Sequence, residues 1–214
     1  MARDHGARVV WIGRSACDDA IQEKIDAVAA VGPAPAYLKA DARDPEALRR
    51  AYETIKARYG AVHGVIVATL GDYDRSLADM PEALFADILS TKLDVAVRVA
   101  ACFADESLDF LAFFSSMASF ARPGGMGAYS AASAFTDAFA YHLVRRGTAK
   151  ARVVNWGYWD LGGGARVTEA MKSLVAHRGV VPIAATEGFA ALDALLAAPY
   201  VQLAVTKTRR PEQI

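Results

Sequence analysis

FLAFFSSMASFARPGGMGAYSAASAFTDAF, residues 110–139, has the pattern of a strand, a loop and a helix in succession. The apolar, aromatic run 110–114 is short enough to be a buried strand, and it stops at Ser115-Ser116. A Pro-Gly-Gly loop follows at residues 123–125. Tyr129 then opens a segment whose apolar positions recur at helical spacing: Ala132, Phe135, Phe139 and Leu143. We therefore expect Tyr129 on the first turn of a helix, after a loop that can fold back toward Ser116 at the carboxyl end of a strand, where open α/β sheets bind their ligands.

A serine hydroxyl facing a tyrosine phenol suits the donation of a proton to a carbonyl oxygen while a hydride reaches the carbon. An ordinary phenol, with a pKa of about 10, is a poor acid at neutral pH, and a nearby ammonium would lower that pKa. Lys92 is the candidate ammonium because it is an isolated cation between apolar neighbours in a predicted helix over residues 85–104. Taken singly, each residue has a common structural explanation: a packed tyrosine, a capping serine and a lysine that reaches out to water.

With these residues the chain resembles the short-chain dehydrogenase/reductase superfamily, and within it the ketoreductase domains of modular polyketide synthases. The superfamily's serine precedes its tyrosine by about thirteen residues, as Ser116 precedes Tyr129 here. Polyketide ketoreductases are similar in taking the lysine from the preceding helix, in a segment like Ile88-Leu-Ser-Thr-Lys92-Leu-Asp-Val. Most of the superfamily instead has its lysine four residues after the tyrosine, and polyketide ketoreductases usually have asparagine there. This chain has Ser133 at that position, and the resemblance implies a proton-relay role for it.

The composition indicates one folded domain over residues 1–214. The chain is 54% hydrophobic with a formal charge of zero, which argues against disorder and against a nucleic-acid-binding surface. Cys17 and Cys102 form no metal or disulfide pattern, and the four histidines have no ligand spacing, so we expect no metal and a reducing cytoplasm. Charges interrupt every apolar run before about 18 residues, and the start does not have the pattern of a signal peptide, so we expect no membrane span.

The resemblance places an NADPH site along the chain. Gly13-Arg14-Ser15 follows a predicted strand, residues 8–12, and is similar to the family segment that binds the 2′-phosphate of NADPH. From the residues alone, a surface turn with a solvated arginine is equally compatible with this segment. Asp41 and Ala42, after a short strand at residues 36–39, are similar to the family's adenine contact.

The later part of the chain is expected to approach the nicotinamide and the substrate. Ala68-Thr69, after the strand 64–68, corresponds to the family's turn beside the nicotinamide ribose. Asn155-Trp156-Gly157 is similar to the family segment near the nicotinamide, and Trp159 falls where the substrate binds. An aspartate aligned with Asp74 accompanies one hydroxyl stereochemistry in polyketide ketoreductases, which here predicts the D-type product; a solvated loop acid is at least as compatible with the sequence. Residues 161–164, with three glycines, and a helix over 169–177 are expected to form a lid over the substrate.

The alternation of strands and helices predicts an α/β fold: a Rossmann-like, doubly wound parallel sheet of the 3-2-1-4-5-6 kind with helices on both faces. Two features of that fold are not found before Arg8 in this sequence. They are the first, central strand and the glycine-rich loop that binds the pyrophosphate. Three explanations remain: a truncated chain, a ketoreductase split between two polypeptides, or a sheet that closes without its first strand. We expect one of the first two, and poor cofactor affinity for this chain alone.

The sequence thus predicts reduction of a β-ketoacyl thioester, carried on an acyl carrier protein, to the β-hydroxyacyl thioester with NADPH. The expected partners are that carrier-bound substrate, other polyketide synthase domains and a chain that supplies the missing β-α unit, with no nucleic acid and no membrane. Tyr129 would give the proton, Ser116 would hydrogen-bond the carbonyl oxygen and Lys92 would lower the pKa of the tyrosine. The alternatives are a non-catalytic module that helps to scaffold a synthase, and, less favoured, a free-standing reductase of small alcohols or sugars.

Overall fold

The computed structural model describes residues 2–70, 76–147, 150–159 and 179–213. Its contacts divide the chain into two compact units. Unit 1 comprises residues 1–63 and 97–107, and unit 2 comprises residues 64–96 and 108–214. Asp74 and the predicted lid, residues 161–177, lie outside the described residues. The prediction of one domain over residues 1–214 stays a prediction.

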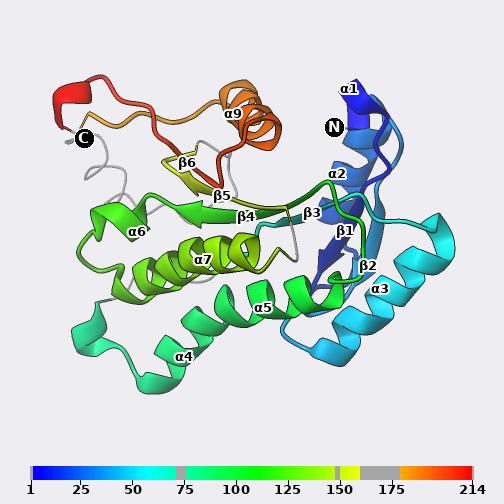
Figure 1. The fold of residues 1–214 in the computed structure, drawn as a ribbon, viewed down its shortest axis with the longest axis horizontal. Helices are drawn as coiled ribbons and strands as arrows, with labels where there is room; N and C mark the ends of the chain where they lie inside the picture. Colours follow the sequence, from blue (N-terminus) through cyan, green and yellow to red (C-terminus); the bar gives the residue numbers. More distant parts are fainter. Residues whose placement is uncertain (1, 71–75, 148–149, 160–178, 214) are drawn as a thin grey trace. The chain divides into compact units, whose positions relative to one another are not determined.

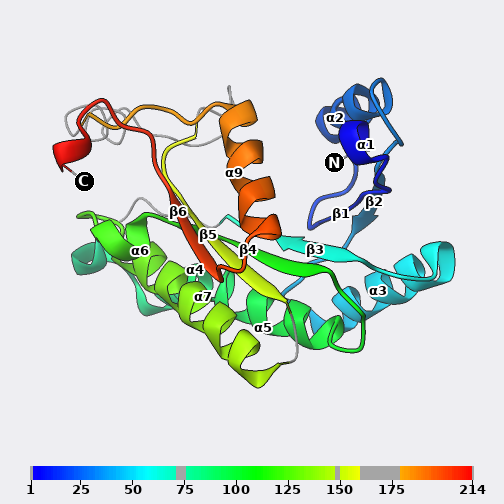
Figure 2. The ribbon, with the colours of Figure 1, turned by 45° about the horizontal axis from the view of Figure 1, so that its top comes forward.

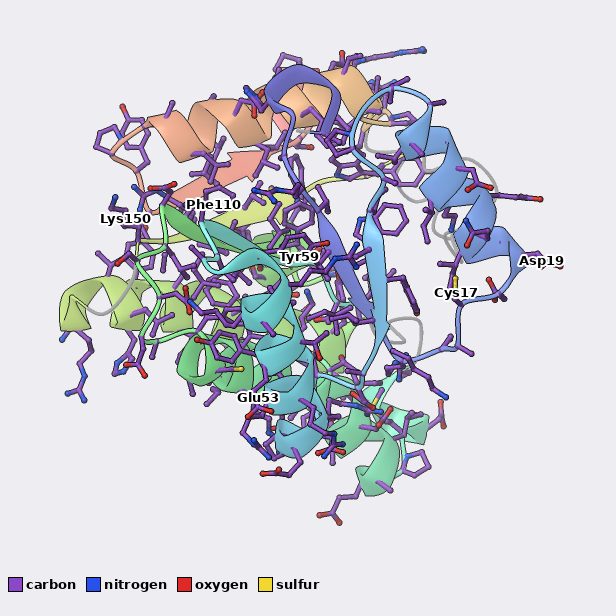
Figure 3. All side chains as sticks on the ribbon, turned by 90° about the vertical axis from the view of Figure 1, so that its right-hand side faces the viewer. Cys17, Asp19, Glu53, Tyr59, Phe110 and Lys150 are labelled. Atoms are coloured by element: carbon purple, nitrogen blue, oxygen red, sulfur yellow. The ribbon has the colours of Figure 1, made fainter. Side chains whose placement is uncertain are left out.

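Unit 1 is built on two parallel strands, β1 (Val10–Gly13) and β2 (Ala36–Lys39), which pair from Val10 with Ala36 to Gly13 with Lys39. Three helices accompany them: α1 (Ala2–His5), α2 (Asp19–Ala29) and α3 (Pro45–Tyr59). Figure 3 labels Asp19 at the start of α2, with Cys17 just before it, and Glu53 and Tyr59 on α3. Aspartates cap both long helices, because Asp18 accepts from the Ile21 amide at 2.8 Å and Asp44 accepts from the Glu46 amide at 2.9 Å.

Unit 2 contains a parallel sheet in the order β3-β4-β5-β6. The strands are β3 (Gly64–Val67), β4 (Phe110–Ser116), β5 (Ala151–Trp156) and β6 (Gln202–Val205). Its core lies on the two middle strands, where Leu111, Phe113, Val153 and Val154 are at most 1% exposed. Such continuous burial is the pattern of parallel strands covered on both faces. The other elements of this unit are η1 (Leu77–Asp79), α4 (Glu82–Ser90), α6 (Ala118–Ala121), α7 (Gly127–Arg146), α9 (Ala185–Ala197) and η2 (Pro211–Gln213). Helix α5 (Leu93–Cys102) begins in unit 2, and its residues from Val97 onward belong to unit 1.

Helices cover both faces of this four-stranded sheet (Figures 1 and 2). Helix α7 contacts β4 and β5, and α9 contacts β5 and β6 from the opposite face. The α/β class, the parallel strands and the helices on both faces are therefore confirmed. None of the helices in the described ranges is long and apolar enough to cross a membrane.

The predicted sheet order is present in two parts. The expected order 3-2-1-4-5-6, without its central strand 1, leaves a two-stranded and a longer sheet, and the described strands form such a pair: β1-β2 and β3-β4-β5-β6. The strands predicted over residues 8–12, 36–39, 64–68 and 110–114 correspond to β1, β2, β3 and β4, within two residues at either end. The strand predicted over 110–114 continues through Ser116, because Ser115 and Ser116 pair with Asn155 and Trp156 of β5.

One predicted helix was wrong. The single helix expected over residues 85–104 is two helices, α4 and α5, which are separated by Thr91 and Lys92. At this break the Lys92 amide donates a 3.1 Å hydrogen bond to the carbonyl of Leu89, three residues earlier. The Thr91 hydroxyl donates a 2.7 Å hydrogen bond to the carbonyl of Ile88. A threonine that bonds the preceding turn and an i to i−3 bond are common ways for a helix to end. Lys92 therefore lies at a junction between helices.

Candidate active site

Lys92 is a buried cation in contact with α7 and β4. Lys92 is 4% exposed, and its side-chain Nζ donates a 2.9 Å hydrogen bond to the carbonyl oxygen of Phe114 in β4. The same Nζ lies 5.3 Å from the centroid of the Tyr129 ring. This distance is in the range of a cation–π interaction. The structure thus brings together two of the predicted catalytic residues, Lys92 and Tyr129.

Burial lowers the pKa of Lys92 from its ordinary value of 10.5 to about 8, while the carboxylate of Asp137 acts in the opposite direction. An ammonium in a dry environment loses hydration, and a nearby negative charge restores part of that loss. Lys92 therefore changes its charge closer to neutral pH than an ordinary lysine does.

Tyr129 and Ser116 come from neighbouring elements of unit 2. Tyr129 lies on the first turn of α7, as the spacing of apolar residues predicted. Ser116 is the last residue of β4, and its Oγ accepts a 3.1 Å hydrogen bond from the Ala118 amide at the start of α6. Because the hydroxyl accepts in this bond, its proton remains available to donate to a substrate.

Ser133 lies one turn further along α7 on the same helix face as Tyr129. It is 0% exposed, and its Oγ has no hydrogen-bond partner in the described part of the chain. Its main-chain carbonyl accepts a 3.2 Å hydrogen bond from the Ser115 hydroxyl of β4. The predicted relay residue is thus deeply buried, with a hydroxyl that can still take a partner.

Asn155 is fully buried, and its side chain joins β5 to β4, α7 and β6. Its Nδ2 has two protons and four acceptors within 3.2 Å, while its Oδ1 accepts a 2.8 Å bond from Nε2 of Gln202. The four acceptors are Asp137 Oδ2 at 2.8 Å, Ser119 Oγ at 3.0 Å, and Ser115 Oγ and the Ser116 carbonyl at 3.2 Å. The cofactor contact expected of Asn155 stays a prediction, and its side chain has a structural role that the sequence did not indicate.

Asp137 is the residue of this region that sequence reasoning missed. One oxygen, Oδ2, accepts from Asn155, and the other, Oδ1, is buried with no hydrogen-bond partner among the described residues. A signal was present in the sequence, because Asp137 follows Tyr129 and Ser133 at intervals of four residues and so shares their face of the helix.

Trp156, Gly157 and Trp159 extend from the end of β5 toward α9 within unit 2. The Trp156 ring packs edge-on against Phe114 and Trp159, with centroid distances of 5.4 and 4.8 Å. Gly157 donates to the Val205 carbonyl at 2.7 Å, and a Cβ at this glycine would come within 2.9 Å of the same oxygen. Trp159 bridges to Ile183 and packs against Gly188 of α9. The predicted substrate contact of Trp159 stays a prediction, and its ring is in contact with α9.

The predicted 2′-phosphate and adenine residues lie in unit 1, where β1 and β2 end. Arg14 and Ser15 are exposed directly after β1, and Asp41 and Ala42 are half-buried after β2. Partial burial raises the pKa of Asp41, but the hydrogen bonds and charge of Arg43, with a smaller contribution from Arg14, hold it below its ordinary value. Arg43, whose Nη2 lies 3.1 Å from Asp41 Oδ2, was not predicted. The strand ends thus carry two cations beside one carboxylate.

Ala68 and Thr69 follow β3 in unit 2, beside the junction that carries Lys92. The Thr69 hydroxyl donates a 2.7 Å hydrogen bond to the Thr91 carbonyl, and Ala68 is exposed. A separate pocket of about 290 Å³ lies between α6 and α7, and residues on another face of α7 than that of Tyr129 line it, among them Gly127, Ser130 and Ala134. Within the described ranges no three side chains of His, Cys, Asp or Glu gather as metal ligands would.

Comparison with known proteins assigns this arrangement to a family. The KR domain model matches residues 1–161. The chain is 42% identical over 214 residues to polyketide synthase ThaG of Burkholderia thailandensis, an alignment that covers 100% of this chain and 4% of that protein. It is also 42% identical over 207 residues to polyketide synthase PksN of Bacillus subtilis, covering 97% of this chain and 4% of the relative. The chain thus spans about 4% of the length of these curated relatives.

Solved structures agree with this assignment. A ketoreductase domain from the bacillaene assembly line superimposes with a TM-score of 0.86 at 28% identity, covering 96% of this chain and 50% of that one. An A1-type ketoreductase gives a TM-score of 0.83 at 26% identity, covering 97% of this chain and 44% of that one. The chain therefore belongs to the KR domain family, the ketoreductase domains of modular polyketide synthases, whose Rossmann-like fold is that of short-chain dehydrogenases/reductases.

Proposed function

We propose that this chain supplies the catalytic residues for NADPH-dependent reduction of a β-ketoacyl thioester, bound to an acyl carrier protein, to the β-hydroxyacyl thioester. The observation that carries the proposal is the buried Lys92 ammonium, 5.3 Å from the centroid of the Tyr129 ring. A buried lysine against a tyrosine on the first turn of a helix is costly for stability, and it is useful where the phenol must act as an acid.

In this proposal Tyr129 donates its proton to the ketone oxygen of the substrate as the carbon–oxygen double bond becomes a single bond. Ser116 donates a hydrogen bond to the same oxygen while negative charge develops on it. Lys92 favours the charged phenolate left behind and so lowers the pKa of Tyr129. Ser133, whose buried hydroxyl has no described partner, is suited to hold a water that returns a proton to the site.

NADPH, when bound, would supply the hydride that reaches the ketone carbon. The residues after β1 and β2 fit its adenosine end, because Arg14 is an exposed cation beside the carboxylate of Asp41. We assign the 2′-phosphate to Arg14 and Ser15, and the adenine to Asp41 and Ala42. Ala68 and Thr69 would contact the ribose, and the segment Asn155-Trp156-Gly157 would contact the nicotinamide. Asp74 and Trp159 are assigned to the substrate side, with a D-type hydroxyl product.

Replacing Tyr129 by phenylalanine tests the proposal. We expect the Tyr129→Phe protein, assayed with NADPH and a small β-keto thioester in the presence of a segment that supplies the glycine-rich loop, to lose at least about 100-fold in kcat. Its circular dichroism should be unchanged. Tyr141→Phe is the matched control, since Tyr141 is on the same helix and is 44% exposed. Turnover of Tyr129→Phe at the level of this control would exclude Tyr129 as the proton donor.

The second candidate function is a non-catalytic module, or part of a split ketoreductase that needs a partner chain. It is favoured by one observation, which is that the sequence contains no G-x-G-x-x-G pattern for the pyrophosphate. The same assay, run with and without the glycine-rich segment, separates a catalytic chain that needs a partner from a non-catalytic module. Reduction that appears only when the glycine-rich segment is supplied supports a catalytic chain with a partner, and no reduction under either condition supports the module.

A further inference from the structure

We propose that Asp137 is a positioning residue for this reduction, which keeps Lys92 charged beside Tyr129 by supplying a fixed negative charge in the same part of unit 2. The inference rests on the proposed function, because it concerns the lysine that tunes the proton donor. In this inference Asp137 acts through Lys92.

Lys92 is almost fully buried, so water does not stabilise its charge. Its hydrogen bond to the Phe114 carbonyl satisfies one of the three protons of the ammonium and contributes no negative charge. A buried ammonium without a counter-charge tends to release its proton. Lys92 therefore needs a carboxylate nearby if it is to stay charged at neutral pH.

Asp137 is that carboxylate, and it is held in place. Tyr129, Ser133 and Asp137 follow one another at intervals of four residues along the face of α7 that packs on β4 and β5. The Asn155 amide fixes Asp137 Oδ2 at 2.8 Å, and Gln202 fixes the Asn155 carbonyl oxygen, also at 2.8 Å. A chain of hydrogen bonds from β6 through β5 thus orients the carboxylate on α7.

The second oxygen of Asp137 makes the charge available to Lys92. Oδ1 is buried and has no hydrogen-bond partner in the described part of the chain. The carboxylate of Asp137 therefore makes no direct ion pair through this oxygen. In a medium of low polarity its negative charge acts on other charged groups over a longer distance than in water. In agreement, Asp137 is the charge that opposes the effect of burial on the lysine.

The other groups near Lys92 come from each element around it. From α7 it faces the Tyr129 ring, and from β4 it faces the uncharged Phe114 carbonyl. Helix α7 also carries Asp137, whose carboxylate acts on the lysine through its charge. The flanking helices carry Asp87 on α4, which is exposed, and Asp94 on α5, which is half-buried. Of these acids, Asp137 is the one that raises the pKa of Lys92.

The test replaces Asp137 by asparagine, which keeps the shape and removes the charge. We expect the pKa of Lys92 to fall by about one unit, as for loss of one opposite charge near a buried group. It can be followed by NMR titration of the lysine ¹³Cε signals, with Lys92 identified by the signal missing in Lys92→Met. The alkaline limb of the kcat profile should move to lower pH by the same amount, and Asp137→Glu should restore both. Asp137→Ser serves the same test if the asparagine variant does not fold.

Two controls make the result specific. Asp87→Asn removes one negative charge from an exposed position on α4 and should leave the Lys92 titration and the alkaline limb where they are. In a Lys92→Met background, Asp137→Asn should cause no further shift of the kcat profile, because the residue through which it acts is gone.

The outcomes separate this inference from the proposed function. The NMR titration uses neither NADPH nor substrate, so an unchanged Lys92 titration in Asp137→Asn overturns the inference whatever the activity. A wild-type protein that is inactive with the glycine-rich segment present, while the Lys92 titration does move, overturns the proposed function instead. A shifted titration with an unmoved alkaline limb shows that Asp137 does not act in the reaction, which also overturns the inference.

Discussion

Lys92 is a buried ammonium whose presence lowers the stability of the folded chain. A lysine that is 4% exposed, with one carbonyl as its hydrogen-bond acceptor, destabilises the folded chain relative to an apolar residue of similar size. Tyr129 lies over it and Asp137 opposes the loss of its proton. Such an arrangement is typical of residues that are present for activity.

The cost of Lys92 depends on pH in a direction that can be measured. The depression of its pKa from 10.5 to about 8 corresponds to about 3 kcal/mol. Below pH 8 both states carry the proton, and the folded state bears the whole penalty. Between pH 8 and 10.5 the unfolded state keeps a proton that the folded state has lost, so this residue makes stability rise with pH.

We therefore expect Lys92→Met to raise the free energy of unfolding at pH 7 by about 1–3 kcal/mol. The lower end of this range applies if the carboxylate of Asp137 is destabilised by the loss of the Lys92 charge. The rise in stability with pH between 8 and 10.5 should become smaller by about 3 kcal/mol. Urea denaturation at pH 7 and pH 10.5 measures both. Lys150→Met is the control, because Lys150 is exposed, and a Lys92→Met protein that is less stable than this control at pH 7 would contradict the prediction.

Among the elements, the contact between α9 and the segment after β5 depends on one glycine. Gly188 is buried inside α9, and a Cβ there would lie 2.9 Å from Cζ3 of Trp159 and closer still to Cζ2 and Cη2. Glycine in a helix interior normally costs about 1 kcal/mol relative to alanine. The close approach of the Trp159 ring reverses that preference.

Gly188→Ala should therefore destabilise the protein by about 1–3 kcal/mol, although it improves helix propensity. The ring of Trp159 must move away from α9 and from Trp156, so tryptophan fluorescence should change together with the melting temperature. Gly124→Ala is the matched control, since Gly124 is exposed and has no atom within 4 Å of an added Cβ. An increase in melting temperature for Gly188→Ala would show that the ring does not pack against the helix in this way.

The elements could be predicted from the sequence where local patterns determine them. The buried strands, the helix that begins just before Tyr129 and the Asp44 cap follow from apolar spacing and capping residues alone. The break at Thr91 could not be predicted, because the apolar positions continue through it and the break depends on two hydrogen bonds. The network around Asn155 joins residues up to 47 positions apart, and such pairing is visible only after the chain has folded.

At the scale of the whole molecule, the two sheets leave strand edges that no described strand covers. On one side the four-stranded sheet ends at β3, where Ile66 is 38% exposed, and β1 pairs on one side only, with β2. Parallel strands are normally buried within a sheet, and exposed edges expose unpaired backbone groups. A parallel strand beside β3 would satisfy those groups and cover Ile66.

Cofactor binding by these 214 residues depends on the same part of the fold. In Rossmann-like folds the first strand ends in the glycine-rich turn that brings backbone amides and a helix N-terminus to the pyrophosphate, and this sequence contains no such pattern. The residues after β1 and β2, which we propose for the adenosine end, would not replace that turn. We therefore expect NADPH to bind the 214-residue chain with a Kd weaker than about 100 μM, in a titration that follows NADPH fluorescence. An added segment with a strand and a glycine-rich turn should tighten the Kd at least about tenfold, and the same segment with valines in place of its glycines should not. Micromolar affinity of the chain alone would show that the pyrophosphate is held by residues other than a glycine-rich turn.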